Sequence, residues 1–469
     1  MPGAVAKHEL SSRLVVVETE NGMGRSAQEG NSATPQGPTP SWREALLFWL
    51  KLGFISFGGP AGQIAIMHQE LVERRRWISE SRFLHALNYC MLLPGPEAQQ
   101  LATYIGWLMH RTAGGLVAGI LFVLPSLLIL IGLSWIYMAF GEKPLVAGIF
   151  YGIKPAVAAI VFLAAWRIGL RVLKHRLLWI IAAVSFVAIF ALQLPFPAIV
   201  AAAALTGYLA GRLAPQIFAN GGAASQGLAA IVDEPRQAHT HFSWRRLVIV
   251  LVTGGALWLL PMLALAIGFG WEHTWTQLGW FFTKAALLTF GGAYAVLPYV
   301  YQGAVDHYNW LNALQMIDGL ALGETTPGPL IMVVAFVGFV AAWGQALLGS
   351  EQLLLAGTLA AVLVTWFTFL PSFVFILAGG PMVESTHGEL RLTAPLTAVT
   401  AAVVGVIVNL ALFFAYHALW PEGFSSGVDV VSVLLMLVAA VALFRFRQGV
   451  IPVIAGCAAV GLLSVWLAG

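Results

Sequence analysis

The stretch LPGPEAQQ, residues 93–100, lies within an apolar segment that is long enough to cross a bilayer. Its prolines break helices, and its glutamate and glutamines are costly to place in lipid. The stretch TTPGPLIM, residues 325–332, places a second Pro-Gly-Pro in a second apolar segment. Unpaired peptide groups in hydrocarbon cost several kcal/mol each unless they are buried in protein or face a water-filled cavity. We therefore expect both stretches to be helix breaks that line a functional site.

The composition is that of a membrane protein. The chain has 469 residues, of which 59% are hydrophobic and only 10% are charged, whereas soluble domains carry roughly 25% charged residues. The apolar runs are too long for the alternating strands of a membrane β-barrel. The sequence therefore predicts an all-α polytopic membrane protein, which makes the lipid bilayer one partner. The net charge of +3 gives no reason to expect a nucleic-acid partner.

The apolar stretches predict about thirteen transmembrane helices. We expect these spans at 43–66, 83–109, 114–140, 145–166, 177–193, 195–211, 244–269, 276–301, 311–343, 353–379, 393–417, 428–444 and 449–468. The predicted domains are a disordered cytoplasmic tail (1–41), a first transporter repeat (42–213), a cytoplasmic loop (214–243), a linking helix (244–270) and a second transporter repeat (271–469).

The lysines and arginines of the loops predict the orientation, because cytoplasmic loops carry an excess of positive charge. Most of these residues fall on one side when the N-terminus is cytoplasmic and the C-terminus periplasmic. The cluster ERRRW at 73–77 is an exception, since it falls on the periplasmic side. We expect a multi-pass protein of the inner membrane.

The two halves of the chain resemble each other in register. FWLKLGFISFGG (48–59) matches FFTKAALLTFGG (281–292), and the two Pro-Gly-Pro motifs keep the same offset of 233 residues. The predicted spans place seven helices between equivalent elements, which is an odd number. The second copy is therefore expected to enter the membrane from the opposite side, as in the inverted repeats of secondary transporters.

Each half contains two predicted breaks, Phe-Gly-Gly in its first span and Pro-Gly-Pro in its second. A helix that resumes after Pro-Gly-Pro begins with unpaired amides and the positive end of its dipole, which favours an anion. A proline kink that serves only packing is the alternative, and the matched set in both halves favours binding. The substrate-binding residues expected from this pattern and from the nearby polar and basic side chains are Lys51, Gly58, Gly59, Pro94, Gly95, Pro96, Gln99, Gln100, Lys284, Gly291, Gly292, Thr325, Thr326, Pro327, Gly328 and Pro329.

Two glutamates next to the breaks are candidates for proton coupling. Glu97 follows the first Pro-Gly-Pro and Glu324 precedes the second, and carboxylates inside a membrane are usually functional. A purely structural role as caps of the broken helices is equally open. Asn88 and Asp318, earlier in the same spans, are weaker candidates.

Basic residues near the breaks have two possible roles. Lys51 and Lys284 each lie six residues before a Phe-Gly-Gly motif. They either offset the charge of a bound anion or extend to the membrane interface. Arg74, Arg75 and Arg76 form either a positive vestibule or an ordinary solvated loop.

From about residue 42 to its C-terminus, the chain resembles the chromate ion transporter (CHR) family in its long two-domain form. The motifs that carry the resemblance are FGGPAGQIAIMHQELVERRRWIS, LLPGPEAQQLATYIGW, FGGAYAVLPYV, ETTPGPLIMVVAFVGF and FLPSF. The resemblance implies efflux of chromate, a tetrahedral dianion, and resistance to it. The second half departs from the first at Ala293, where the first has Pro60, and at Leu330, where the first has Glu97.

Other functions remain open at this point. The chain could carry sulfate or another oxyanion, or it could be an anion channel. A chromate-reducing enzyme is disfavoured, because the sequence has no flavin, haem or metal-binding motif. The sequence also has no GxxxxGK[ST] loop, which disfavours direct use of ATP for transport. We therefore expect no cofactor, no resident metal and no enzymatic activity.

Overall fold

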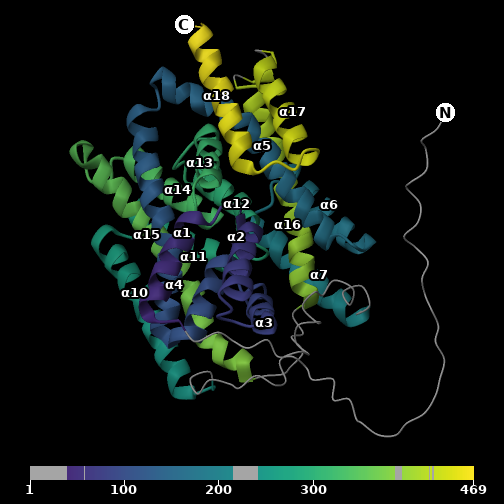
Figure 1. The fold of residues 1–469 in the computed structure, drawn as a ribbon. Helices are drawn as coiled ribbons and strands as arrows, with labels where there is room; N and C mark the ends of the chain where they lie inside the picture. Colours follow the sequence, from purple (N-terminus) through teal and green to yellow (C-terminus); the bar gives the residue numbers. More distant parts are fainter. Residues whose placement is uncertain are drawn as a thin grey trace, which may run out of the picture. The chain divides into compact units, whose positions relative to one another are not determined.

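The computed structural model describes residues 40–57, 59–214, 241–385, 393–421, 423–424 and 427–468. Nearly all of the predicted tail, most of the 214–243 loop and the candidate residue Gly58 lie outside these ranges. The described residues form sixteen α-helices and no β-strand (Figure 1). The predicted all-α polytopic fold is confirmed.

The first half contains seven α-helices and one π-helical turn. They are α1 (Trp42–Ile55), α2 (Gly59–His68), η1 (Gln69–Arg74), α3 (Glu80–Cys90), α4 (Glu97–Phe140), α5 (Pro144–Val172), α6 (Arg176–Phe190) and α7 (Phe196–Leu213). The helix α10 (Trp244–Phe269) follows and packs on α11 and α15 of the second half.

The second half repeats this order of elements. Its elements are α11 (Thr274–Leu288), α12 (Ala293–Tyr301), η4 (Gln302–His307), α13 (Ala313–Thr325), η5 (Leu330–Met332), α14 (Val333–Gly344), η6 (Ser350–Gln352), α15 (Leu353–Ser385), α16 (Thr393–Leu419), α17 (Val430–Phe444) and α18 (Val450–Ala468).

Helix α4 consists of two arms joined by a sharp turn. Its 44 residues leave helical geometry at His110 and Arg111, where φ is −134° and +56°. A Cβ atom added to Gly106 would lie only 2.5 Å from the Gly114 carbonyl oxygen, so the two arms pack backbone against backbone. The turn falls between the spans predicted at 83–109 and 114–140.

The predicted breaks are present, and they shorten the helices on either side. Four predicted spans each consist of two helical pieces separated by non-helical residues. These spans are 43–66, 83–109, 276–301 and 311–343. Among the described residues, seven helices are individually long and apolar enough to cross a membrane, and they are α4, α5, α7, α10, α15 with η6, α16 and α18. The count of thirteen spans stays a prediction, because the short helices of a broken span fall below the length by which a membrane-spanning helix is identified.

The two halves share an unusual backbone conformation. The π-helical turns η1 and η4 are each followed by a residue with positive φ, Arg76 at +53° and Asn309 at +51°. The amides of Trp77 and Trp310 then bond to the carbonyls of Leu71 and Ala304, both at 2.8 Å. The repeat seen in the sequence is therefore also a repeat of local structure.

The later helices of the two halves pack on each other reciprocally. Helix α5 packs against α16, α17 and α18, and α16 packs against α5, α6 and α7 (Figure 1). Because α5 and α16 occupy equivalent places in the two halves, these contacts are related by an approximate two-fold operation.

Small residues allow the close approach of α5 and α18. A Cβ atom on Gly461 would lie 2.5 Å from the Gly152 nitrogen and would overlap the Gly148 carbonyl. We expect Gly461→Leu to lower the thermal stability of the purified protein by several degrees, because close helix packing is a main source of cohesion in membranes. Gly456→Leu on the same helix is the control, since nothing lies within 4 Å of its added Cβ. Equal melting temperatures for the two variants would contradict this packing.

Candidate functional site

The breaks of one half are hydrogen-bonded to the breaks of the other. The Gly328 amide, in the second Pro-Gly-Pro, donates to the Ser56 carbonyl just before the first Phe-Gly-Gly, at 2.8 Å. The Gly95 amide, in the first Pro-Gly-Pro, donates to the Thr289 carbonyl just before the second Phe-Gly-Gly, at 2.7 Å. We call these contacts the Ser56 junction and the Thr289 junction.

The two junctions are equivalent in the repeat. Ser56 corresponds to Thr289 and Gly95 to Gly328, each at the offset of 233 residues. A contact from copy one to copy two is thus matched by the same contact from copy two to copy one, which is the pattern of a two-fold axis. The two junctions also lie near each other, since a Cβ atom added to Gly292 would lie 3.9 Å from Pro60 Cγ, so the four breaks meet between the halves although they are far apart in sequence.

Each junction requires glycine. Gly95 and Gly328 have φ of +128° and +102°, a region that side chains strongly disfavour. A Cβ atom on Gly95 would overlap the Ser372 hydroxyl, and one on Gly328 would lie 2.7 Å from the Ser126 Cβ atom. Ser126 and Ser372 end the two Leu-Pro-Ser motifs of the repeat, so a third element of each half contributes to the site.

The junction bonds show how the amides within the two Pro-Gly-Pro motifs are paired. The amides of Gly95 and Gly328 are occupied by carbonyl oxygens and are not free for a ligand. The amides in the first turn of α4 are in a different situation, because the N-cap residue Pro96 provides no side-chain hydrogen bond to them. The physical reason is that a buried amide must be paired, and the break of the other half provides the nearest acceptor.

Glutamine side chains support both junctions from different positions. Gln63 Nε2 donates to the Gly328 carbonyl at 2.5 Å and to the Ser56 carbonyl at 3.4 Å. Gln100 Nε2 donates to the Pro94 carbonyl at 2.8 Å and to Ser372 Oγ at 3.4 Å. These two glutamines are not equivalent in the repeat, so the side chains around the junctions are asymmetric.

The acidic and amide candidates lie near these breaks. Glu324, the penultimate residue of α13, is 7% exposed and accepts a hydrogen bond from the Tyr294 hydroxyl. Glu97, at the start of α4, is half-buried, and Gln99 is fully buried with its Nε2 on Thr103 Oγ1 at 3.0 Å.

The remaining candidates around the breaks are mainly backbone positions. Thr325 Oγ1 donates to the carbonyls of Ala321 and Leu322 in its own helix, and Thr326 Oγ1 donates to that of Gly323. The other candidates belong to the break segments themselves, and they are Gly59, Pro94, Pro96, Gly291, Gly292, Pro327 and Pro329.

The structure places the two lysines in different surroundings. Lys51 is exposed on α1. Lys284 lies over the Trp280 ring at 5.6 Å and lines a pocket of about 370 Å³. That pocket also contains Glu272 and His307, but none of the junction residues lines it. The matched spacing of the lysines therefore does not correspond to matched environments.

The arginines of the ERRRW cluster lie in the loop between α2 and α3. Arg74 pairs with Glu70 at 2.6 Å, and Arg75 reaches Glu70 at 3.5 Å and lies over the Phe48 and Trp77 rings. Arg76 is exposed. Two of the three predicted vestibule residues thus already have local partners.

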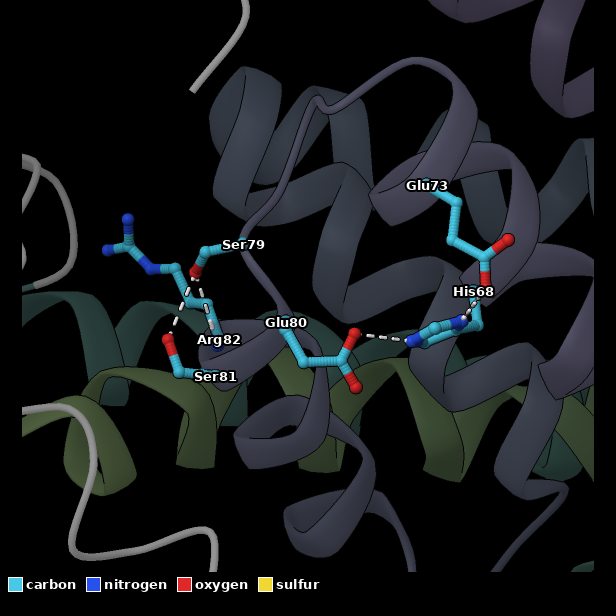
Figure 2. Close-up of polar contacts among 6 residues, drawn as sticks. All are labelled: His68, Glu73, Ser79, Glu80, Ser81 and Arg82. Atoms are coloured by element: carbon cyan, nitrogen blue, oxygen red, sulfur yellow. Dashed lines mark hydrogen bonds and ion pairs between the residues drawn. The ribbon is translucent and has the colours of Figure 1, made fainter. Parts of the chain in front are cut away.

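The same loop is held by a histidine between two glutamates. His68, the last residue of α2, places Nδ1 3.3 Å from Glu73 and Nε2 2.5 Å from Glu80 (Figure 2). Ser79 caps α3 by accepting from the Arg82 amide at 3.3 Å. This arrangement ties α2 to α3 and is structural in character.

A charge pair with a buried carboxylate also joins the two halves. Lys154 Nζ on α5 lies 3.6 Å from Asp318 Oδ2 on α13, and the Tyr137 hydroxyl donates to the same oxygen at 2.9 Å. Asp318 was a weaker sequence candidate, and Lys154 was not singled out. A lysine in the middle of an apolar span was the available signal, since such a residue seldom lacks a partner.

Comparison with known proteins identifies the family. The model described as Chromate transporter matches residues 43–208 and 276–462. The chain belongs to the chromate transporter family. The family match covers most of both halves, and α10 lies between the two matched segments.

The curated relatives extend over most of the chain. The chromate transport protein of Cupriavidus metallidurans (strain CH34) is 30% identical over 430 residues, covering 91% of this chain and 94% of the relative. The chromate transport protein of Pseudomonas aeruginosa is 34% identical, covering 82% and 83%. A probable chromate transport protein of Synechococcus elongatus is 27% identical, covering 81% and 86%. No solved structure matches the chain.

Proposed function

We propose that this chain is a secondary transporter that exports chromate across the inner membrane and so gives chromate resistance. The observation that carries the proposal is the reciprocal junction of four helix breaks between two repeated halves. Discontinuous helices that meet between repeats form the substrate sites of many secondary transporters. The names of the relatives direct the choice of substrate toward chromate.

The membrane potential favours this direction of transport. An inside-negative membrane drives an anion outward by about 2.3 kcal/mol per charge per 100 mV, and a dianion by about twice that. In this proposal the two halves are inserted in opposite orientations, with the N-terminus cytoplasmic and the C-terminus periplasmic. Export then proceeds by alternating exposure of the junction region to the two sides.

The decisive experiment measures uptake of labelled chromate into inside-out vesicles with the potential clamped and with sulfate as competitor. Saturable uptake that depends on the protein and rises with an inside-positive potential is the expected result. Uptake of sulfate in preference to chromate would assign the chain to a sulfate or general oxyanion carrier. Flux without saturation or counterflow would assign it to an anion channel. Chromium recovered from the vesicles only in reduced form would mean that chromate is reduced during the assay, which contradicts transport of unchanged chromate.

Glu97 is the proposed proton-coupling residue, with Glu324 as its counterpart in the second half. A carboxyl group that carries a proton during transport cannot be replaced by an amide. We therefore expect Glu97→Gln to reduce uptake by about tenfold or more and to remove its pH dependence. Glu44→Gln, at the exposed N-terminus of α1, is the control and should keep both. A normal pH profile in Glu97→Gln would refute the coupling role.

A further inference from the structure

The two junctions are equivalent in backbone but differ in their hydroxyl groups. At the Thr289 junction the Thr289 hydroxyl donates to the Ala285 carbonyl at 2.7 Å, and Ser372 Oγ accepts from Gln100. At the Ser56 junction the hydroxyl oxygens of Ser56 and Ser126 have no hydrogen-bond partner. Both serines are fully buried, at 0% exposed.

The unpartnered atoms of the Ser56 junction belong to three residues that lie around Gly328. The Ser56 carbonyl accepts from Gly328, and an added Cβ on Gly328 would lie 3.1 Å from Ser126 Oγ. Gln63, 1% exposed, bonds to both Ser56 and Gly328 and leaves its own Oε1 unpartnered. Its orientation is determined by those two carbonyls, since only the amide nitrogen can donate to them.

Buried hydroxyls without partners are rare in proteins, and each needs an explanation, such as a group that is bound during function. We infer that the Ser56 junction, and not its counterpart, holds the transported oxyanion through the hydroxyls of Ser56 and Ser126. This inference rests on the proposed transport function. Gln63 Oε1 is an acceptor, so a ligand that satisfies all three atoms carries at least one hydroxyl, as a singly protonated tetrahedral oxyanion does.

The asymmetry explains how a repeated fold provides one site. Gln63 aligns with Val296 in the second half, so the second half has no amide at that position. Each junction has one unpartnered amide oxygen, Gln63 Oε1 or Gln100 Oε1, but only the Ser56 junction has unpartnered hydroxyls beside it. The first copy thus provides unpartnered hydroxyls at the Ser56 junction. The hydroxyl groups that the second copy provides at the Thr289 junction already take part in hydrogen bonds.

The test compares matched substitutions in the full-length purified protein. We expect Ser56→Ala and Ser126→Ala each to weaken chromate binding, measured by titration calorimetry, by about tenfold or more, the effect of losing a hydrogen bond to a charged group. Gln63→Glu should abolish binding, because it places a carboxylate beside the anion. The equivalent changes Thr289→Val and Ser372→Ala should weaken binding less than the Ser56-junction changes do. Ser134→Ala, which removes a buried unpartnered hydroxyl elsewhere on α4, is the control and should alter binding by less than about threefold.

The outcomes separate this inference from the proposed function. If the wild-type protein neither binds nor transports chromate or sulfate, the proposed function is wrong and the inference fails with it. If the wild-type protein transports chromate but the three Ser56-junction variants match it, only the inference is overturned. Equal losses at both junctions also overturn it. Size-exclusion profiles identify a misfolded variant, and Ser126→Cys, which keeps the shape of the side chain but is a much weaker donor, then replaces Ser126→Ala.

Discussion

Gly95→Ala and Gly328→Ala will each abolish chromate uptake into vesicles, or reduce it by at least about tenfold. Both glycines have positive φ, and an added methyl group would overlap Ser372 or Ser126. The backbone strain alone is about 1–3 kcal/mol, and the overlap adds to it. Because each glycine donates the backbone hydrogen bond of its junction, this strain would pull the two breaks of that junction apart.

Gly132→Ala is the matched control for these substitutions. It lies within a helical arm of α4, and nothing lies within 4 Å of its added Cβ. Alanine is favoured over glycine in helices, so transport and stability should be kept or slightly improved. A Gly95→Ala/Ser372→Ala double variant should recover part of the lost uptake, since it removes the overlapping hydroxyl. Wild-type uptake by Gly95→Ala would show that the junction is not needed for transport.

Lys154→Met will destabilise the protein by about 3–5 kcal/mol, the usual cost of leaving one member of a buried ion pair alone. Asp318 is 4% exposed in its side chain and Lys154 is 23% exposed, so neither charge is fully solvated. The lost interaction joins α5 of the first half to α13 of the second. The measurement is unfolding of the purified protein in mixed micelles, followed by tryptophan fluorescence.

A double-substitution cycle separates the pair from its surroundings. Asp318→Asn alone should destabilise by a similar amount, whereas Lys154→Met/Asp318→Asn should be more stable than the sum of the single effects predicts. Lys143→Met, at the exposed N-cap of the same helix α5, should change the stability by less than about 0.5 kcal/mol. Additive effects in the cycle would mean that Lys154 and Asp318 do not interact.

The breaks themselves were predictable from sequence because their cause is local. Proline removes a donor and glycine permits positive φ wherever they stand in a chain, so Pro-Gly-Pro and Phe-Gly-Gly identified the non-helical residues. The repeat was visible for a similar reason, since both copies preserve these residues at one offset. The conserved offset extends to the π-helical turns η1 and η4, which no residue pattern had indicated.

The environments of individual side chains were less predictable. Lys51 and Lys284 have the same spacing to a break, yet one is exposed and the other lines a pocket with Trp280. Ser126 and Ser372 end matching Leu-Pro-Ser motifs, at 124–126 and 370–372, and nothing local shows that they reach the glycines of the opposite half. Lys154 has its partner 164 positions away in the chain, on α13.

By itself, the sequence determined that this protein is a helical membrane protein of two related halves with a broken helix pair in each, because hydropathy and backbone stereochemistry act over a few residues. Only the tertiary structure decided which break meets which, that the Gly95 and Gly328 amides are used between the halves, and that hydroxyls remain unpaired at one junction alone. Those facts depend on hydrogen bonds between residues 194 and 272 positions apart, and such pairing is set by how whole helices pack.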